Sequence, residues 1–118
     1  MTGPRDFTVE RRADEHGRVV VDVAGDLDYA SYGRLEAELT DAVAAGPPVL
    51  VVDLSSVTYC DSCGLRVLLG AAGEQRRAGG EFTLRAVRGQ PARALRLTGL
   101  DVVLGGADGA ACERKVGL

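Results

Sequence analysis

The chain contains no tryptophan, and its aromatic residues are limited to two phenylalanines and three tyrosines among 118 residues. Proteins that hold single-stranded nucleic acid stack the bases on aromatic side chains, so this scarcity argues against such a ligand. Basic residues are outnumbered, 14 against 17 acidic ones, and a net charge of -3 lacks the positive surface of a DNA- or RNA-binding protein. We therefore expect no direct nucleic-acid partner.

The chain also lacks a long apolar run. No stretch approaches the length of a membrane span, and residues 1–6 have no apolar core of a signal peptide, which predicts a cytoplasmic protein without a membrane partner. Three cysteines cannot all pair, and 118 residues bury enough surface to fold without disulfides or metals. We expect no cofactor, no metal site and one domain over residues 1–118, with residues 1–5 disordered and a weakly structured tail at 105–118.

What is present is a regular succession of strand and helix patterns. Residues 7–12 and 18–24 flank a turn cluster, which predicts a β-hairpin. The later patterns predict a helix at 31–45, a strand at 49–53, a helix at 62–78, a strand at 81–87, a helix at 90–97 and a last strand at 101–104. Strands separated by such helices pair in parallel. The predicted fold class is α/β, with a mixed sheet that opens on an antiparallel hairpin and is otherwise largely parallel.

One serine, Ser62, stands where a predicted buried strand gives way to a helix. The run 49–52 before it is apolar and rich in valine, as in a strand covered on both faces. A helix start leaves N–H groups unpaired and carries partial positive charge, so it stabilises an anion. Asp61 and Ser62 are the candidate helix caps, and a phosphate on Ser62 would be compatible with the fold. Ser62 is therefore a candidate switch.

Three segments, in this order, resemble the anti-sigma-factor antagonist family of bacterial STAS domains. They are Gly-Asp-Leu-Asp at 25–28, the stretch 53–65 with Asp-Ser-Cys-Gly-Leu at its end, and Leu-Arg-Leu-Thr-Gly-Leu at 95–100. The resemblance implies helices packed mainly on one face of the sheet, and regulation without catalytic residues. It also implies that an anti-sigma factor, itself an ATP-dependent serine kinase, binds the unphosphorylated chain, releases a sigma factor and phosphorylates Ser62. A serine phosphatase would restore the cycle.

The resemblance further implies a partner-binding surface made of Asp28, Asp61, Ser62, Cys63 and Gly64, with Asp28 close to Ser62. The residues alone are also consistent with purely structural roles, because aspartates at such positions also cap helices and close turns. A phosphate would add roughly 1.5 to 2 negative charges beside the two aspartates. An interface that buried this charge would lose affinity, which is the expected mechanism of the switch.

Two alternative functions remain at this point. Cys60 and Cys63 form Cys-Asp-Ser-Cys at a strand-to-helix junction, a context that suits a dithiol redox protein. Against this, the element order opens with a hairpin, no tryptophan precedes the pair, and cysteines also pack as small apolar residues. The other alternative is a STAS module that no longer cycles and serves as a scaffold.

Nearby polar residues have structural interpretations. Asp53 is expected to end its strand and accept hydrogen bonds from loop N–H groups, with Ser55 and Ser56 as turn formers. Four arginines gather near the predicted fourth strand and third helix: Arg85, Arg88, Arg93 and Arg96. A solvated face explains them as well as an acidic partner surface does.

Overall fold

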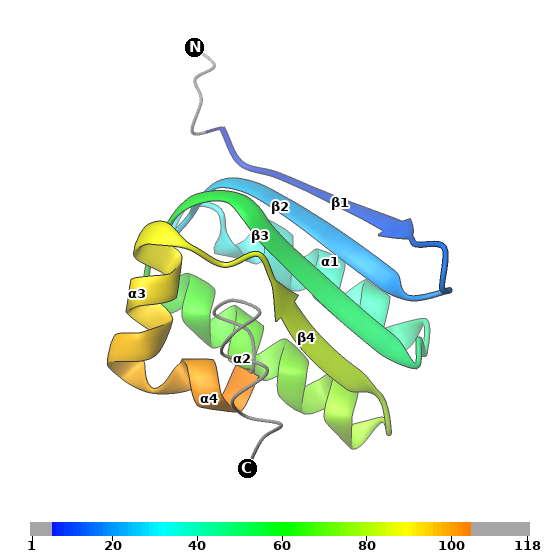
Figure 1. Cartoon of the computed structure of the whole chain (residues 1–118). Coiled ribbons are helices and arrows are strands. Elements are labelled where there is room, and N and C mark those ends of the chain that lie inside the picture. Colours follow the sequence, from blue (N-terminus) through cyan, green and yellow to red (C-terminus); the bar gives the residue numbers. More distant parts are fainter. Residues whose placement is uncertain (1–5, 105–118) are drawn as a thin grey trace.

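A computed structural model of the protein describes residues 6–104. The strands form one sheet in chain order: β1 (Thr8–Ala13), β2 (Val19–Leu27), β3 (Val49–Cys60) and β4 (Glu81–Arg85). β1 and β2 pair antiparallel, whereas β2, β3 and β4 run parallel. The helices are α1 (Tyr32–Ala44), α2 (Ser62–Arg77), α3 (Gly89–Thr98) and α4 (Leu100–Leu104). All four lie on the same side of the sheet (Figure 1).

This architecture confirms the predicted fold class of a mixed sheet with an N-terminal antiparallel hairpin and helices on one face. The ends of α1, α2 and α3 lie within one residue of the predicted ends. Glycines with positive φ follow these helices, as at Gly79 (φ 90°) and Gly99 (φ 78°), because the left-handed conformation that stops a helix suits glycine. No helix within residues 6–104 is long and apolar enough to cross a membrane.

The hydrophobic core lies between the sheet and the helices. Burial alternates along β2 because successive side chains point to opposite faces of a strand, so that Val21, Val23 and Leu27 enter the core. Buried residues of the two longest helices recur at helical spacing: Leu35, Leu39 and Ala42 on α1, and Leu65, Leu68 and Ala72 on α2. This packing fixes where α2 begins relative to the ends of the strands.

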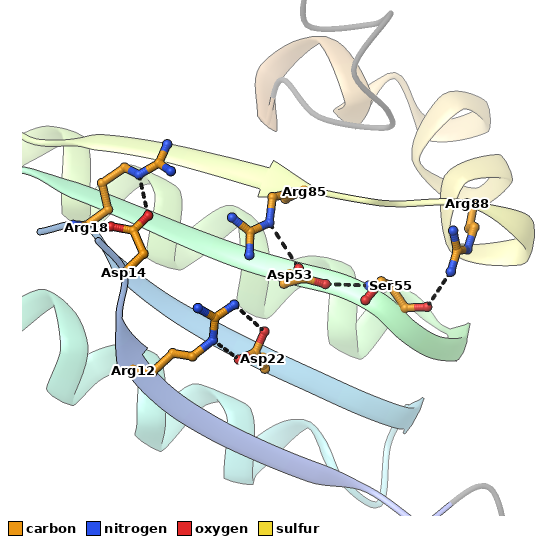
Figure 2. Close-up of polar contacts among 8 residues, drawn as sticks. All are labelled: Arg12, Asp14, Arg18, Asp22, Asp53, Ser55, Arg85 and Arg88. Carbon is orange, nitrogen blue, oxygen red and sulfur yellow. Dashed lines mark hydrogen bonds and ion pairs between the residues drawn. The ribbon is translucent and has the colours of Figure 1, made fainter. Parts of the chain in front are cut away.

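The opposite face of the sheet is covered by charged side chains rather than by a second layer of helices (Figure 2). Val20 and Val51 are neighbours on this face and are only 0% and 2% exposed. Two ion pairs lie beside them: Arg12 Nε to Asp22 Oδ2 at 2.6 Å, and Arg85 Nε to Asp53 Oδ2 at 3.0 Å. Aliphatic stems of arginine can cover apolar surface. The run 49–52 is thus covered on both faces as predicted, but by helices on one face only.

The predicted end of the third strand was wrong. β3 continues past Asp53 to Cys60, so Ser55 and Ser56 are strand residues and not turn formers. The added stretch pairs with the end of β2, from Ala24 opposite Ser56 to Leu27 opposite Cys60; one register shift precedes this stretch, between Asp22 and Ala24, and a second falls within it, between Gly25 and Asp26. Such bulges accommodate extra residues on one strand of a pair. The expected local bond of Asp53 is present, since its Oδ1 accepts from the Ser55 N–H at 2.9 Å.

The predicted last strand at 101–104 was also wrong, because these residues belong to α4. Two adjacent valines favour a strand locally, but Leu104 is fully buried and packing overrides that preference. The Asp101 side chain accepts a hydrogen bond from the Val102 N–H at 3.0 Å within this short helix. The predictions for residues 1–5 and for the tail at 105–118 lie outside the described residues.

Candidate functional site

The candidate site lies where β3 ends and α2 begins; we call residues 60–64 the Ser62 corner. Asp61 is the N-cap of α2, with extended backbone angles of φ -104° and ψ -172°. Its Oδ1 accepts from the Cys63 N–H at 2.9 Å and the Gly64 N–H at 3.2 Å. Of the two predicted caps, Asp61 performs the capping and Ser62 is the first helical residue. Ser62 is exposed, and its hydroxyl has no hydrogen-bond partner among residues 6–104.

Asp61 also joins the corner to the loop between β2 and α1. Its second carboxylate oxygen, Oδ2, accepts from the Tyr29 N–H at 3.1 Å. Its own N–H donates to the Leu27 carbonyl oxygen at 3.1 Å, which continues the parallel ladder of β2 and β3. Because the carboxyl ends of two adjacent parallel strands meet at one edge of a sheet, residues far apart in sequence come together here. Asp61 therefore anchors the corner both to the loop, through its side chain, and to β2, through its backbone.

Asp28 lies in that neighbouring loop, one residue before Tyr29. Its Oδ1 accepts from the Ala30 N–H at 3.0 Å, which closes a local turn, and its N–H donates to the Ser31 Oγ at 3.0 Å. The other oxygen, Oδ2, makes no hydrogen bond to the described part of the chain. The structure thus brings Asp28 beside the Ser62 corner, with one carboxylate oxygen available to a partner.

Gly64 has a packing role at the start of α2. A Cβ at this position would lie 2.6 Å from Leu27 Cγ, closer than real contacts allow, and 3.0 Å from Cys60 Sγ, tighter than most real contacts. Gly64 is buried, and Leu65 beside it points into the core. This geometry lets the first turn of α2 press against the ends of β2 and β3. Of the predicted partner-binding residues, Gly64 is therefore the least accessible.

Comparison with known proteins assigns the family. A family model described as "Mlab, STAS domain" matches residues 10–105. The chain is also 34% identical over 101 residues to the anti-sigma-F factor antagonist RsfB of Mycobacterium tuberculosis, a match that covers 86% of this chain and 81% of RsfB. The chain belongs to the anti-sigma-factor antagonist family of bacterial STAS domains.

Several solved structures share the fold of this chain. A crystal structure of an anti-sigma factor antagonist from Mycobacterium paratuberculosis matches this STAS domain with a TM-score of 0.78 at 33% identity, covering 88% of this chain and 87% of that one. The antagonist SpoIIAA matches at 22% identity over 80% of this chain, with TM-scores of 0.66 for its unphosphorylated form and 0.62 for its phosphorylated form. These matches cover 82% and 85% of the respective SpoIIAA chains. The likeness to SpoIIAA supports the fold alone.

The cysteines of this STAS domain do not favour dithiol chemistry. Cys60 and Cys63 are both free thiols. Burial, with the nearby Asp61 charge as a smaller cause, raises the pKa of the Cys60 thiol to about 12. Because the thiolate is the reactive form, a thiol with such a pKa is a poor nucleophile at neutral pH. Cys60 instead packs its sulfur toward Gly64 as a small apolar residue, and Cys112 lies outside the described residues.

The start of α2 offers fewer free N–H donors for binding an anion than the sequence predicted. The Cys63 and Gly64 N–H groups already bind the Asp61 carboxylate, and the Leu65 N–H donates to the Asp61 carbonyl oxygen at 3.0 Å. Within residues 6–104 only the Ser62 N–H of this first turn has no acceptor. A phosphate on Ser62 would therefore remain largely in solvent, beside the carboxylate of Asp61.

Three exposed residues near the corner are not among the predicted site residues. Tyr29 is 78% exposed and adjoins Asp28. Arg66 and Leu69 are exposed on α2, four and seven residues after Ser62, so they continue its face of the helix. The available signal was the i, i+4, i+7 spacing from Ser62, together with a tyrosine in a chain that has only three. An aromatic ring, a cation and a leucine around a hydroxyl are suited to binding a protein partner.

Proposed function

We propose that this STAS domain binds an anti-sigma factor, and so frees a sigma factor, until phosphorylation of Ser62 weakens the complex. The observation that carries the proposal is the Ser62 hydroxyl, which is exposed at the capped start of α2 and has no hydrogen-bond partner among the described residues. The similarity to RsfB, named as an anti-sigma-F factor antagonist, supports this class of partner. The partner would be an ATP-dependent serine kinase, and a serine phosphatase would reverse the modification. The domain acts as a binding partner and a phosphate acceptor, not as an enzyme.

The proposed contact surface combines the Ser62 corner with the adjoining loop. Asp28 and Ser62 provide polar contacts, and the exposed ring of Tyr29 provides the large aromatic group that often anchors an interface. Cys63 is partly exposed next to Ser62 and lies within the same patch. Asp61 contributes by holding the loop and the helix start in one arrangement. The surface is thus already formed before any partner arrives, which reduces the entropy lost on binding.

Phosphorylation would act through charge and not through refolding. It adds roughly 1.5 to 2 negative charges at neutral pH. The Cys63 and Gly64 N–H donors are occupied by Asp61, so a phosphate covered by a kinase surface would find only the Ser62 N–H and the Arg66 side chain nearby, and its charge would be incompletely paired. Burying an unpaired ion costs several kcal/mol, and about 1.4 kcal/mol corresponds to tenfold in affinity, so we expect a loss of about a hundredfold or more.

The test is to incubate the domain with candidate anti-sigma kinases and ATP, and to locate the phosphate by mass spectrometry. Binding is then measured for Ser62→Ala and Ser62→Asp. We expect the first to bind like the unmodified domain and the second to bind about a hundredfold more weakly. Ser56→Asp is the matched control, because Ser56 is another exposed serine but lies on β3 away from the corner. Phosphate on a different residue, together with full binding by Ser62→Asp, would overturn the proposal.

A further inference from the structure

One edge of β3 loses its strand partner before the Ser62 corner is reached. β4 pairs with β3 only from Val49 to Asp53, opposite Glu81 to Arg85. Beyond that point the chain leaves the sheet and enters α3, while β3 continues to Cys60. In a parallel ladder, residues along a strand direct their N–H and C=O groups alternately to the two neighbouring strands. The backbone groups of the last β3 residues therefore need partners other than a fourth strand.

Gln90, in the first turn of α3, supplies hydrogen-bond partners for both the N–H and the carbonyl oxygen of Cys60. Its Oε1 accepts from the Cys60 N–H at 2.7 Å, and its Nε2 donates to the Cys60 carbonyl oxygen at 3.0 Å. One side-chain amide thus takes the place of a paired strand residue. On the opposite side of the strand, Cys60 lies opposite Leu27 of β2, whose carbonyl oxygen accepts from the Asp61 N–H.

A displacement of the Cys60 backbone would also be transmitted to the start of α2. Cys60 immediately precedes Asp61, and its sulfur lies against the first turn of α2, where a Cβ on Gly64 would come within 3.0 Å. A shift of the Cys60 backbone would therefore move both the cap of α2 and the packing beneath Ser62. Gln90 lies 30 residues from Cys60 in the sequence, so this link exists only in the folded chain.

We propose that Gln90 is a positioning residue for Ser62: its amide holds Cys60, and through it the Ser62 corner, in the orientation that a kinase requires. This inference rests on the proposed phosphorylation of Ser62. A misplacement of about 1 Å at a reacting group can cost up to a hundredfold in rate. Loss of the Gln90 amide should therefore lower kcat/KM for phosphorylation by between about tenfold and a hundredfold.

The chain contains a matched control for this experiment. Gln75 is a buried glutamine on α2 whose Nε2 also donates to a backbone carbonyl oxygen, that of Pro47, at 2.8 Å. Pro47 precedes β3, at the opposite end of the strand from Cys60. Gln90→Leu and Gln75→Leu both remove a bond donated by a side-chain amide to a backbone carbonyl oxygen, with the same change of side chain; Gln90→Leu also removes the bond accepted from the Cys60 N–H. Gln90→Glu retains an acceptor for the Cys60 N–H and loses the donor to the carbonyl oxygen.

Two readouts test the inference. By NMR, Gln90→Leu should shift the amide signals of Ser62 and Cys63 and speed hydrogen exchange at the Cys60 N–H, whereas Gln75→Leu should leave these signals in place. With the kinase that phosphorylates the unmodified domain, the rate should fall for Gln90→Leu, fall less for Gln90→Glu and stay unchanged for Gln75→Leu. Unchanged amide signals, or equal rate losses for both leucine variants, would overturn the inference. If no kinase modifies Ser62, the proposed function fails, while the NMR comparison still decides whether Gln90 positions the corner.

Discussion

Removing the Asp61 carboxylate should destabilise the domain far more than removing the Ser62 hydroxyl. Asp61→Ala abolishes two capping bonds to α2 and the bond from Oδ2 to the Tyr29 N–H. Loss of an N-cap costs about 1 kcal/mol, and loss of a hydrogen bond to a charged acceptor costs about 1.5 kcal/mol where the site is partly exposed. We expect a loss of about 2 to 3 kcal/mol in the free energy of unfolding, equivalent to roughly 8 to 12 °C in Tm for a domain of this size.

Urea unfolding followed by circular dichroism measures this loss, and two further variants locate it. Asp61→Asn can still cap α2 through its single oxygen, since asparagine caps as well as aspartate, but it then presents an NH₂ group to the Tyr29 N–H. It should cost about 1 kcal/mol, from the loop contact alone. Ser62→Ala should change stability by less than about 0.5 kcal/mol, because its hydroxyl has no partner among the described residues.

The ranking of the three variants is what matters most. If Ser62→Ala cost as much as Asp61→Ala, then the serine would be the working cap, and the division of roles at this corner would be wrong. If Asp61→Ala cost less than about 0.5 kcal/mol, the contacts to Tyr29 and to the helix start would contribute nothing beyond what water offers.

Two further predictions concern acid and thiol chemistry. Burial alone would raise the pKa of Asp53, but hydrogen bonds from Ser55 and Arg85 outweigh it and hold the pKa below its ordinary value. The stabilisation from the ionised Asp53 is present above the unfolded pKa of about 3.9 and is lost as pH falls through the lower folded pKa. Asp53→Asn should therefore lower the free energy of unfolding by about 1 to 2 kcal/mol at pH 7, and by progressively less below about pH 4, as measured by urea titrations. A thiol reagent at pH 8 should label Cys63 in the folded domain, while Cys60 reacts only on unfolding; equal labelling of both would contradict the burial of Cys60.

The long helices were predictable because their signals are local. Leu35, Leu39 and Ala42 lie on one face of α1, and a glycine in the left-handed conformation, Gly46 (φ 76°), follows that helix. The same holds for the start of α2 at Ser62, where a helical repeat directly follows a polar corner, although the end of β3 before it was predicted seven residues too early. Such patterns report which face of an element is buried, and that is enough to fix element type and approximate ends.

The elements that were missed depend on distant contacts. Ser55 and Ser56 have no strand preference of their own, and only their bulged pairing with β2 keeps them extended. Val102 and Val103 favour a strand locally, but the burial of Leu104 folds them into α4. The same reason limits prediction of the site, because the bonds from Asp61 to Tyr29 and from Gln90 to Cys60 join residues 32 and 30 positions apart.

The division of roles at the corner bears on how a modifiable serine can coexist with a stable fold. A serine that capped α2 would have its oxygen committed to backbone N–H groups, and esterifying that oxygen would disturb the helix start. Here Asp61 makes the capping bonds, so the Ser62 oxygen is not part of the structure that holds the helix. Under the proposed function, adding charge at Ser62 would change what the surface can bind while leaving the contacts beneath it intact. The capping role and the proposed switching role then fall on adjacent residues, so single substitutions can separate the two.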